Sequence, residues 1–154
     1  MLAYPVSDKP IDYSKPTFIQ PKLDGVRCVI QYDKEYGVKA YSRTGKPWLN
    51  IDHILMELYD FFQKHPDIVL DGELYNHDLR DNFEKIISLV RKTKPTLEDR
   101  LDAEELTQFH CYDIIDETKT FEERNNFIAQ TVPRNHCVKH VDTIRVATEL
   151  LGKV

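Results

Sequence analysis

The sequence has few of the features that mark membrane, secreted or disulfide-stabilised proteins. Its 154 residues include three cysteines, Cys28, Cys111 and Cys137, which are odd in number and far apart. We therefore expect no disulfide framework and a reducing compartment. No apolar run approaches the length of a membrane-spanning helix, and residues 1–5 lack the basic and apolar regions of a secretory signal. The cytoplasm is the expected location, and a membrane is not an expected partner.

An excess of basic residues is also missing. The chain has 21 Lys and Arg against 26 Asp and Glu, a net charge of −5. Surfaces that bind nucleic-acid phosphates are usually basic, because neutralising phosphates releases counterions. Two explanations stay open for a chain that binds DNA. Its basic residues could be gathered in local patches. Alternatively, most of the contacts with DNA could be made by polypeptide outside this sequence. The candidate patches are Arg43 with Lys46, and Arg91 with Lys92 and Lys94.

The remaining composition is that of one soluble globular domain, and the mixture of expected hairpins and helices is an α+β pattern. Hydrophobic residues make up 41% and charged residues 31%, which is ordinary for such a domain. Residues 1–16 read as an extended lead-in, and Asn50 is the expected N-cap of the first helix. From about residue 142 the apolar spacing predicts a further helix. Strands are expected at about 17–21, 26–32, 38–42, 67–70, 109–115 and 137–141, and helices at 51–64, 82–92, 97–108, 121–130 and from 142 on.

The most informative segment is Lys22-Leu23-Asp24-Gly25-Val26-Arg27, which joins two of the expected strands. Such a turn suits covalent catalysis, in which the lysine amine attacks an electrophile and Arg27 holds an anion nearby. Partial burial and a neighbouring cation favour the unprotonated, nucleophilic amine, and Arg27 is the nearest candidate cation. Asp24 is expected to hold the turn or a metal-bound water. The alternative is an ordinary connecting turn with solvated charges.

Further segments follow in a fixed order, and together they resemble the covalent nucleotidyltransferases. Within that superfamily the succession is most similar to the ATP-dependent DNA ligases encoded by bacteriophages, over about residues 18 to 124. The resemblance implies an adenylation domain of the nucleotidyltransferase (ATP-grasp-like) fold, with antiparallel β-sheets flanked by helices. The segments that carry it are Lys22–Arg27, Ser42-Arg43-Thr44-Gly45, Asp71-Gly72-Glu73-Leu74, Ile87–Lys92 and Tyr112–Asp116.

The resemblance also implies a reaction and a nucleotide site. Lys22 would attack the α-phosphate of ATP, release pyrophosphate and carry AMP as a phosphoramidate, which then activates a DNA 5′-phosphate for nick sealing. Arg27 would lie against the ribose and phosphates. Glu73 would engage the ribose hydroxyls and is a candidate contact for Mg²⁺. Tyr112 would stack on adenine or, alternatively, belong to the core. Gln20 stands where relatives often have a glutamate that accepts a hydrogen bond from the adenine amino group, and an amide oxygen can still accept it.

The other motif residues receive smaller roles by the same resemblance. Arg43 would contact phosphates of the nicked DNA strand, with help from Lys46, or would be an exposed loop arginine. Asp71 is expected to shape a turn, and Gly72 to let the nucleotide approach the backbone. Arg124 is expected to be structural. The His136-Cys137-x-x-His140 segment lacks a Cys-x-x-Cys pair, so zinc is not favoured.

Parts of the family pattern cannot be found after Ile115. Relatives carry a Glu-Gly segment with a lysine, then a paired-lysine segment, then an OB-fold. Residues 17–154 are therefore expected to be the N-terminal part of an adenylation domain from a truncated or split gene, which works with a C-terminal fragment or domain. Two alternatives stay open: a non-catalytic remnant that binds nucleotide or nucleic acid, and a related RNA ligase or capping-type enzyme. Arg27 and the Ser-Arg-x-Gly segment favour DNA ligase over RNA ligase.

Overall fold

The computed structural model describes residues 17–146, which fall into two units. The smaller unit holds residues 17–21 and 142–146 of the described chain, and the larger holds residues 22–141. The expected lead-in, residues 1–16, lies outside the described residues. No helix in the described part of the chain is both long enough and apolar enough to cross a membrane.

The smaller unit is a two-stranded antiparallel ladder. β1 (Thr17–Ile19) pairs with β7 (Ile144–Val146), so that Phe18 lies opposite Arg145. The helix predicted from residue 142 is therefore wrong over residues 144–146, because β-branched residues at alternate positions favour a strand once a partner strand is present. Its remainder lies outside the described residues. Beside the ladder, the Gln20 side-chain amide donates a hydrogen bond to Thr143 Oγ1 at 2.8 Å.

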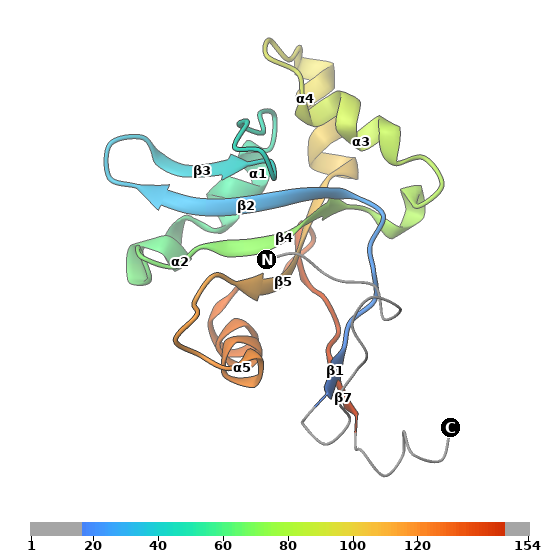
Figure 1. Ribbon diagram of the computed structural model, residues 1–154. Helices are drawn as coiled ribbons and strands as arrows, with labels where there is room; N and C mark the ends of the chain where they lie inside the picture. The colour runs from blue at the N-terminus through green and yellow to red at the C-terminus, as the bar shows by residue number, and fades with distance from the viewer. Residues whose placement is uncertain (1–16, 147–154) are drawn as a thin grey trace. The chain divides into compact units, whose positions relative to one another are not determined.

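The larger unit is built on a five-stranded sheet in the order β3-β2-β4-β5-β6 (Figure 1). The pairs β2–β3, β2–β4 and β4–β5 are antiparallel, as expected, and β5–β6 is parallel. The strands are β2 (Val26–Asp33), β3 (Gly37–Tyr41), β4 (Leu70–Tyr75), β5 (Gln108–Ile114) and β6 (Val138–His140).

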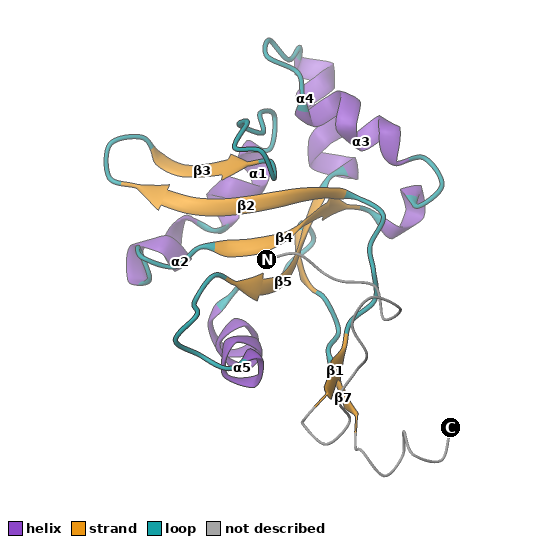
Figure 2. Cartoon of the chain, in the orientation of Figure 1, coloured by secondary structure: helices purple, strands orange, loops and turns teal. Residues whose placement is uncertain are grey.

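Helices flank a sheet whose strand pairs are mostly antiparallel, which confirms the α+β class (Figure 2). The single helix predicted over 51–64 is divided at Leu58 into two short helices. Asn50 is not its N-cap: its backbone has a φ of 58°, and its side-chain amide donates to the Leu89 and Asp99 carbonyl oxygens. The helices are α1 (Asp52–Glu57), α2 (Tyr59–Lys64), η1 (His77–Leu79, a 3₁₀ turn), α3 (Phe83–Val90), α4 (Leu97–Leu106) and α5 (Phe121–Thr131).

Strand register separates an apolar face of the sheet from a charged one. Residues directly opposite each other in an antiparallel ladder point to the same face. Cys28 opposite Gly72 and Ile30 opposite Leu70 therefore share the apolar face. The hydrophobic core forms there, with buried side chains from the helices packed against it, among them Ile54, Leu58, Phe62, Ile86, Val90 and Ile128.

The opposite face of the same strands carries charge. Arg27 lies opposite Glu73, and Val29 lies opposite Asp71. Since the core occupies one face, the charged residues of β2 and β4 are gathered on the other. This separation is what assembles the candidate site.

Candidate functional site

Arg27 and Asp71 form a two-bond ion pair across the β2–β4 ladder. Arg27 Nε donates to Asp71 Oδ1 at 3.0 Å, and Nη2 donates to Oδ2 at 2.8 Å. The Asp71 side chain is 1% exposed and that of Arg27 20%. The hydrogen bonds to Asp71 raise the pKa of Arg27. A buried carboxylate that accepts from Nε and Nη2 together fixes the plane and direction of the guanidinium.

The predicted role of Asp71 is therefore wrong. The strand expected at 67–70 begins at Leu70, so Asp71, Gly72 and Glu73 lie inside β4 and not in a turn after it. A buried aspartate needs a cationic partner, and Arg27 supplies it.

Glu73 is half-buried on the same face. Burial and the neighbouring Asp71 charge raise the pKa of its carboxyl from 4.5 to about 7, while Arg27 and a hydrogen bond from the Gly25 backbone lower it. The carboxyl therefore changes its protonation state near neutral pH. In the ionised form it accepts hydrogen bonds only, and in the protonated form it can also donate one.

Tyr112 lies at a β-bulge. The ladder pairs Asp71 with Asp113 and Gly72 with Cys111, which leaves Tyr112 as the extra residue of β5. Bulges re-aim side chains and are common next to active sites. Burial, and then the charges of Asp71 and Glu73, raise the pKa of the Tyr112 phenol, which stays neutral. Its half-buried ring lies close enough to Arg27 and both carboxylates to interact with them electrostatically.

The segment that precedes β2 is tied to this face through Gly25. A Cβ at Gly25 would collide with the Leu74 carbonyl oxygen, so only glycine lets the segment pass this close to β4. The Gly25 backbone also hydrogen bonds to Glu73. Lys22 stands three residues earlier, with an exposed side chain. Gln20 belongs to the smaller unit.

The packing of β4 against β5 explains why residue 72 is a glycine. A Cβ there would collide with the His110 carbonyl oxygen and would lie 2.8 Å from the Phe109 ring. The missing side chain of Gly72 makes room for the neighbouring strand, which is a structural role that the sequence did not predict.

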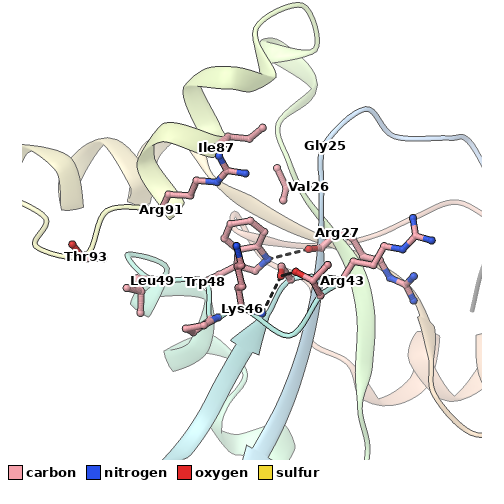
Figure 3. A pocket seen from close by; sticks show the side chains of 13 residues that line it. Gly25, Val26, Arg27, Arg43, Lys46, Trp48, Leu49, Ile87, Arg91 and Thr93 are labelled. Atoms are coloured by element: carbon pink, nitrogen blue, oxygen red, sulfur yellow. Dashed lines mark hydrogen bonds between the residues drawn. The ribbon is translucent and has the colours of Figure 1, made fainter.

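A cationic cavity of about 850 Å³ adjoins Arg27 in the larger unit (Figure 3). Residues from 25–27, 42–49 and 87–93 line it. Four lining residues are cationic, and none is acidic: the cations are Arg27, Arg43, Lys46 and Arg91. The cavity therefore favours an anion.

The loop at 42–46 is a closed turn that presents Arg43. The Ser42 N–H donates to the Lys46 carbonyl oxygen at 2.7 Å, and the Lys46 N–H donates to Ser42 Oγ at 3.1 Å. Next in the chain, the buried Trp48 donates from Nε1 to the Arg27 carbonyl oxygen at 3.0 Å. The predicted residues Arg43 and Lys46 are thereby held beside Arg27. The sequence indicated Arg91 as part of a possible basic patch and of the Ile87–Lys92 segment.

The described residues contain no group of three or more His, Cys, Asp or Glu side chains arranged to hold a metal ion. Mg²⁺ commonly keeps several waters and binds through one or two carboxylates together with substrate phosphates. The carboxylate of Glu73 fits that mode, whereas Asp71 is committed to Arg27. His140 hydrogen bonds with Arg134 and with the Val132 carbonyl oxygen.

Arg124 is structural, as expected. It donates from Nε to the buried Asp113 at 2.8 Å and from Nη1 to the Lys119 carbonyl oxygen at 2.8 Å. Its guanidinium also lies over the Phe121 ring. These contacts join α5 to β5 at the end of the site strand.

Comparisons with known proteins find similarity in sequence and in fold. Residues 1–150 match the family described as the ATP dependent DNA ligase domain. The DNA ligase of African swine fever virus is 40% identical over 62 residues, which are 38% of this chain and 14% of that protein. The chain thus spans a small part of this curated relative.

Solved structures share the fold. A Lig E DNA ligase superposes with a TM-score of 0.68 at 20% identity, over 99% of this chain and 56% of the other. The bacteriophage T7 ATP-dependent DNA ligase, solved in complex with ATP, gives a TM-score of 0.56 at 16% identity, over 90% of this chain and 52% of the other. The chain therefore spans about half the length of these two proteins.

Proposed function

Because this chain belongs to the ATP dependent DNA ligase domain family, we propose that it carries the nucleotide site at which a ligase becomes covalently adenylated. The observation that supports this most strongly is the charged sheet face, where Arg27, Glu73 and Tyr112 meet around the buried Asp71. An aromatic ring, a cation and a carboxylate are the groups that a nucleoside phosphate needs for its base, phosphates and ribose.

Lys22 is the proposed nucleophile. Its unprotonated Nζ attacks the α-phosphorus of ATP, an N–P bond forms, and the bond to the pyrophosphate oxygen breaks. The amine loses a proton to solvent, and AMP stays on the lysine as a phosphoramidate. The rigid contact between Gly25 and β4 supports this role, because it limits how far the Lys22 segment can move from Glu73.

The other residues bind and orient. Arg27, held in one direction by Asp71, pairs with phosphate or ribose oxygens of the nucleotide. Tyr112 stacks on the adenine. Glu73 accepts from the ribose hydroxyls. Mg²⁺, when bound with the nucleotide, neutralises phosphate charge, and Glu73 is the carboxylate that would hold it.

Nicked duplex DNA is the proposed second substrate. Arg43 and Lys46, in the cavity beside Arg27, would contact its phosphates. Transfer of AMP to a DNA 5′-phosphate and sealing of the nick are proposed for this chain together with a further fragment or domain, since the chain spans only part of its relatives.

The test is covalent labelling by ATP that carries radioactive phosphorus in the α-position, in the presence of a divalent cation. We expect label that is lost in acid and survives base, as a phosphoramidate does. Lys22→Ala should abolish it. Lys34→Ala, which removes another exposed lysine, should label as the parent does. Label that persists in Lys22→Ala would remove Lys22 as the nucleophile.

A second arm separates an enzyme from a non-catalytic remnant. A chain that fails to label is incubated again with a segment that carries the distal lysines of a related ligase. Labelling restored by that segment supports the enzyme. Continued absence of label, with ATP still bound, would favour a nucleotide-binding remnant.

A further inference from the structure

We propose that Arg91 is a further DNA contact, and that with Arg43 and Lys46 it completes a groove built for one sugar–phosphate backbone. This proposal rests on the proposed function and deepens it, because it names a residue and a mode of binding for the DNA. The observation that supports it is that two segments far apart in the sequence are held together around the cavity (Figure 3).

The two walls of the groove are joined by hydrogen bonds. The Leu49 N–H donates to the Val90 carbonyl oxygen at 3.0 Å. The Asn50 amide donates to the Leu89 and Asp99 carbonyl oxygens, both at 3.1 Å. Asn50 reaches them from a left-handed backbone conformation that asparagine tolerates better than most residues. The loop that bears Arg43 and the helix end that bears Arg91 are thus set in place before any ligand arrives.

The floor of the groove is largely apolar. Trp48 is 8% exposed and is fixed by its hydrogen bond to the Arg27 carbonyl oxygen. Val26 and Ile87, both half-buried, line the same cavity. An apolar floor below a cationic rim suits a chain that alternates deoxyribose with phosphate better than it suits an isolated anion.

The rim consists of exposed cations that are available to phosphates. Within residues 17–146, Arg43, Lys46 and Arg91 take part in no ion pair, and all three are exposed. Lys92, the next residue, is also exposed, but it pairs with Asp99 at 3.8 Å and does not line the cavity. Figure 3 shows that Arg91 and Arg43 come from different segments and lie on opposite sides of Trp48. The groove therefore carries a local cluster of positive charge although the whole chain is acidic.

The experiment measures binding of a fluorescent nicked DNA duplex to the full chain by anisotropy, over a series of salt concentrations. Arg91→Gln should weaken binding and reduce the slope of log K against log salt by about 0.9, the value for one lost phosphate contact on duplex DNA. Lys92→Gln is the matched control, with the same loss of charge one residue away. It should leave affinity and slope at the parental values. Circular dichroism establishes that each variant is folded.

Three results would overturn the proposal. Arg91→Gln could bind as the parent does while Arg43→Gln binds more weakly, which would remove Arg91 from the groove. Lys92→Gln could weaken binding as much as Arg91→Gln, which would indicate general charge and no specific groove. The groove could also bind a nicked RNA duplex and not DNA. Covalent labelling of Lys22 is measured in parallel, so that loss of labelling in the parent chain, which contradicts the proposed function, is distinguished from failure of Arg91 alone.

Discussion

Asp71 holds Arg27 by two hydrogen bonds from a position that is almost completely buried. The pair links β2 to β4, and it lies beside Glu73 and Tyr112. It therefore acts on stability and on the site together: it compensates a buried charge, and it directs a guanidinium across the face where we propose that the nucleotide binds.

Asp71→Asn should weaken both the fold and the site. The variant keeps the shape of the side chain but turns a charge-assisted pair into a weaker neutral contact, so we expect the free energy of unfolding to fall by about 2 kcal/mol. Urea unfolding measures this. Asp67→Asn, at an exposed position, is the control and should change little. Equal stability of Asp71→Asn and the parent would contradict the structural role of the pair.

Glu73 makes stability depend on pH near neutrality. Its pKa is raised in the folded chain from 4.5 to about 7, so between these values the folded state holds a proton that the unfolded state has released. This contribution to stability is complete below about pH 4.5 and is lost as pH rises through about 7. Glu73→Gln cannot titrate, and its unfolding free energy should fall less between pH 5 and pH 8 than that of the parent.

The control for Glu73 is Glu35→Gln, an exposed glutamate in the β2–β3 turn. It should follow the pH dependence of the parent chain. If Glu73→Gln and the parent show the same change in urea midpoint between pH 5 and pH 8, the raised pKa of Glu73 is wrong.

Tyr112 should contribute its ring and not its hydroxyl to ATP binding. Tyr112→Ala loses the stacking surface, and stacking on a base is worth on the order of 1–3 kcal/mol, so the Kd for ATP should rise about 5- to 150-fold. Tyr112→Phe keeps the ring and should bind ATP nearly as the parent does. Titration calorimetry measures both. Unchanged binding by Tyr112→Ala would make Tyr112 a core residue only.

Gly72 should tolerate no side chain. Gly72→Ala pushes a methyl group against the His110 carbonyl oxygen and the Phe109 ring. Overpacking of this kind costs about 1–3 kcal/mol, so the melting temperature should fall. A variant as stable as the parent would show that β4 and β5 can separate at this point without cost.

The sequence predicted most of what depends on local pattern. Alternating apolar residues predicted β2 and β5, and three- and four-residue spacing predicted α3 and α5 to within a few residues. The segment at 144–146 misled because Ile144 and Val146 were interpreted together with the apolar residues after them as one helical pattern, and pairing with β1 decided the outcome. Asn50 misled in a similar way, since its side chain reaches α3 and α4 and does not cap α1.

The sequence predicted which residues form the site, but it did not predict the contacts between them. Motif order pointed to Arg27, Glu73 and Tyr112, which the structure brings to one face of the sheet. The Arg27–Asp71 pair joins residues 44 positions apart, and the bulge at Tyr112 depends on the register of β4 against β5. Both are consequences of strand pairing, which no local pattern in this chain encodes.

The central claim is that Lys22 becomes covalently adenylated, and peptide mapping by mass spectrometry tests it most directly. The full chain is incubated with ATP and Mg²⁺, digested without exposure to acid, and searched for a peptide that carries AMP. The account predicts the modification on the peptide that contains Lys22, with the adduct on its side chain. Adduct on another lysine, such as Lys34 or Lys39, with none on Lys22, would contradict it.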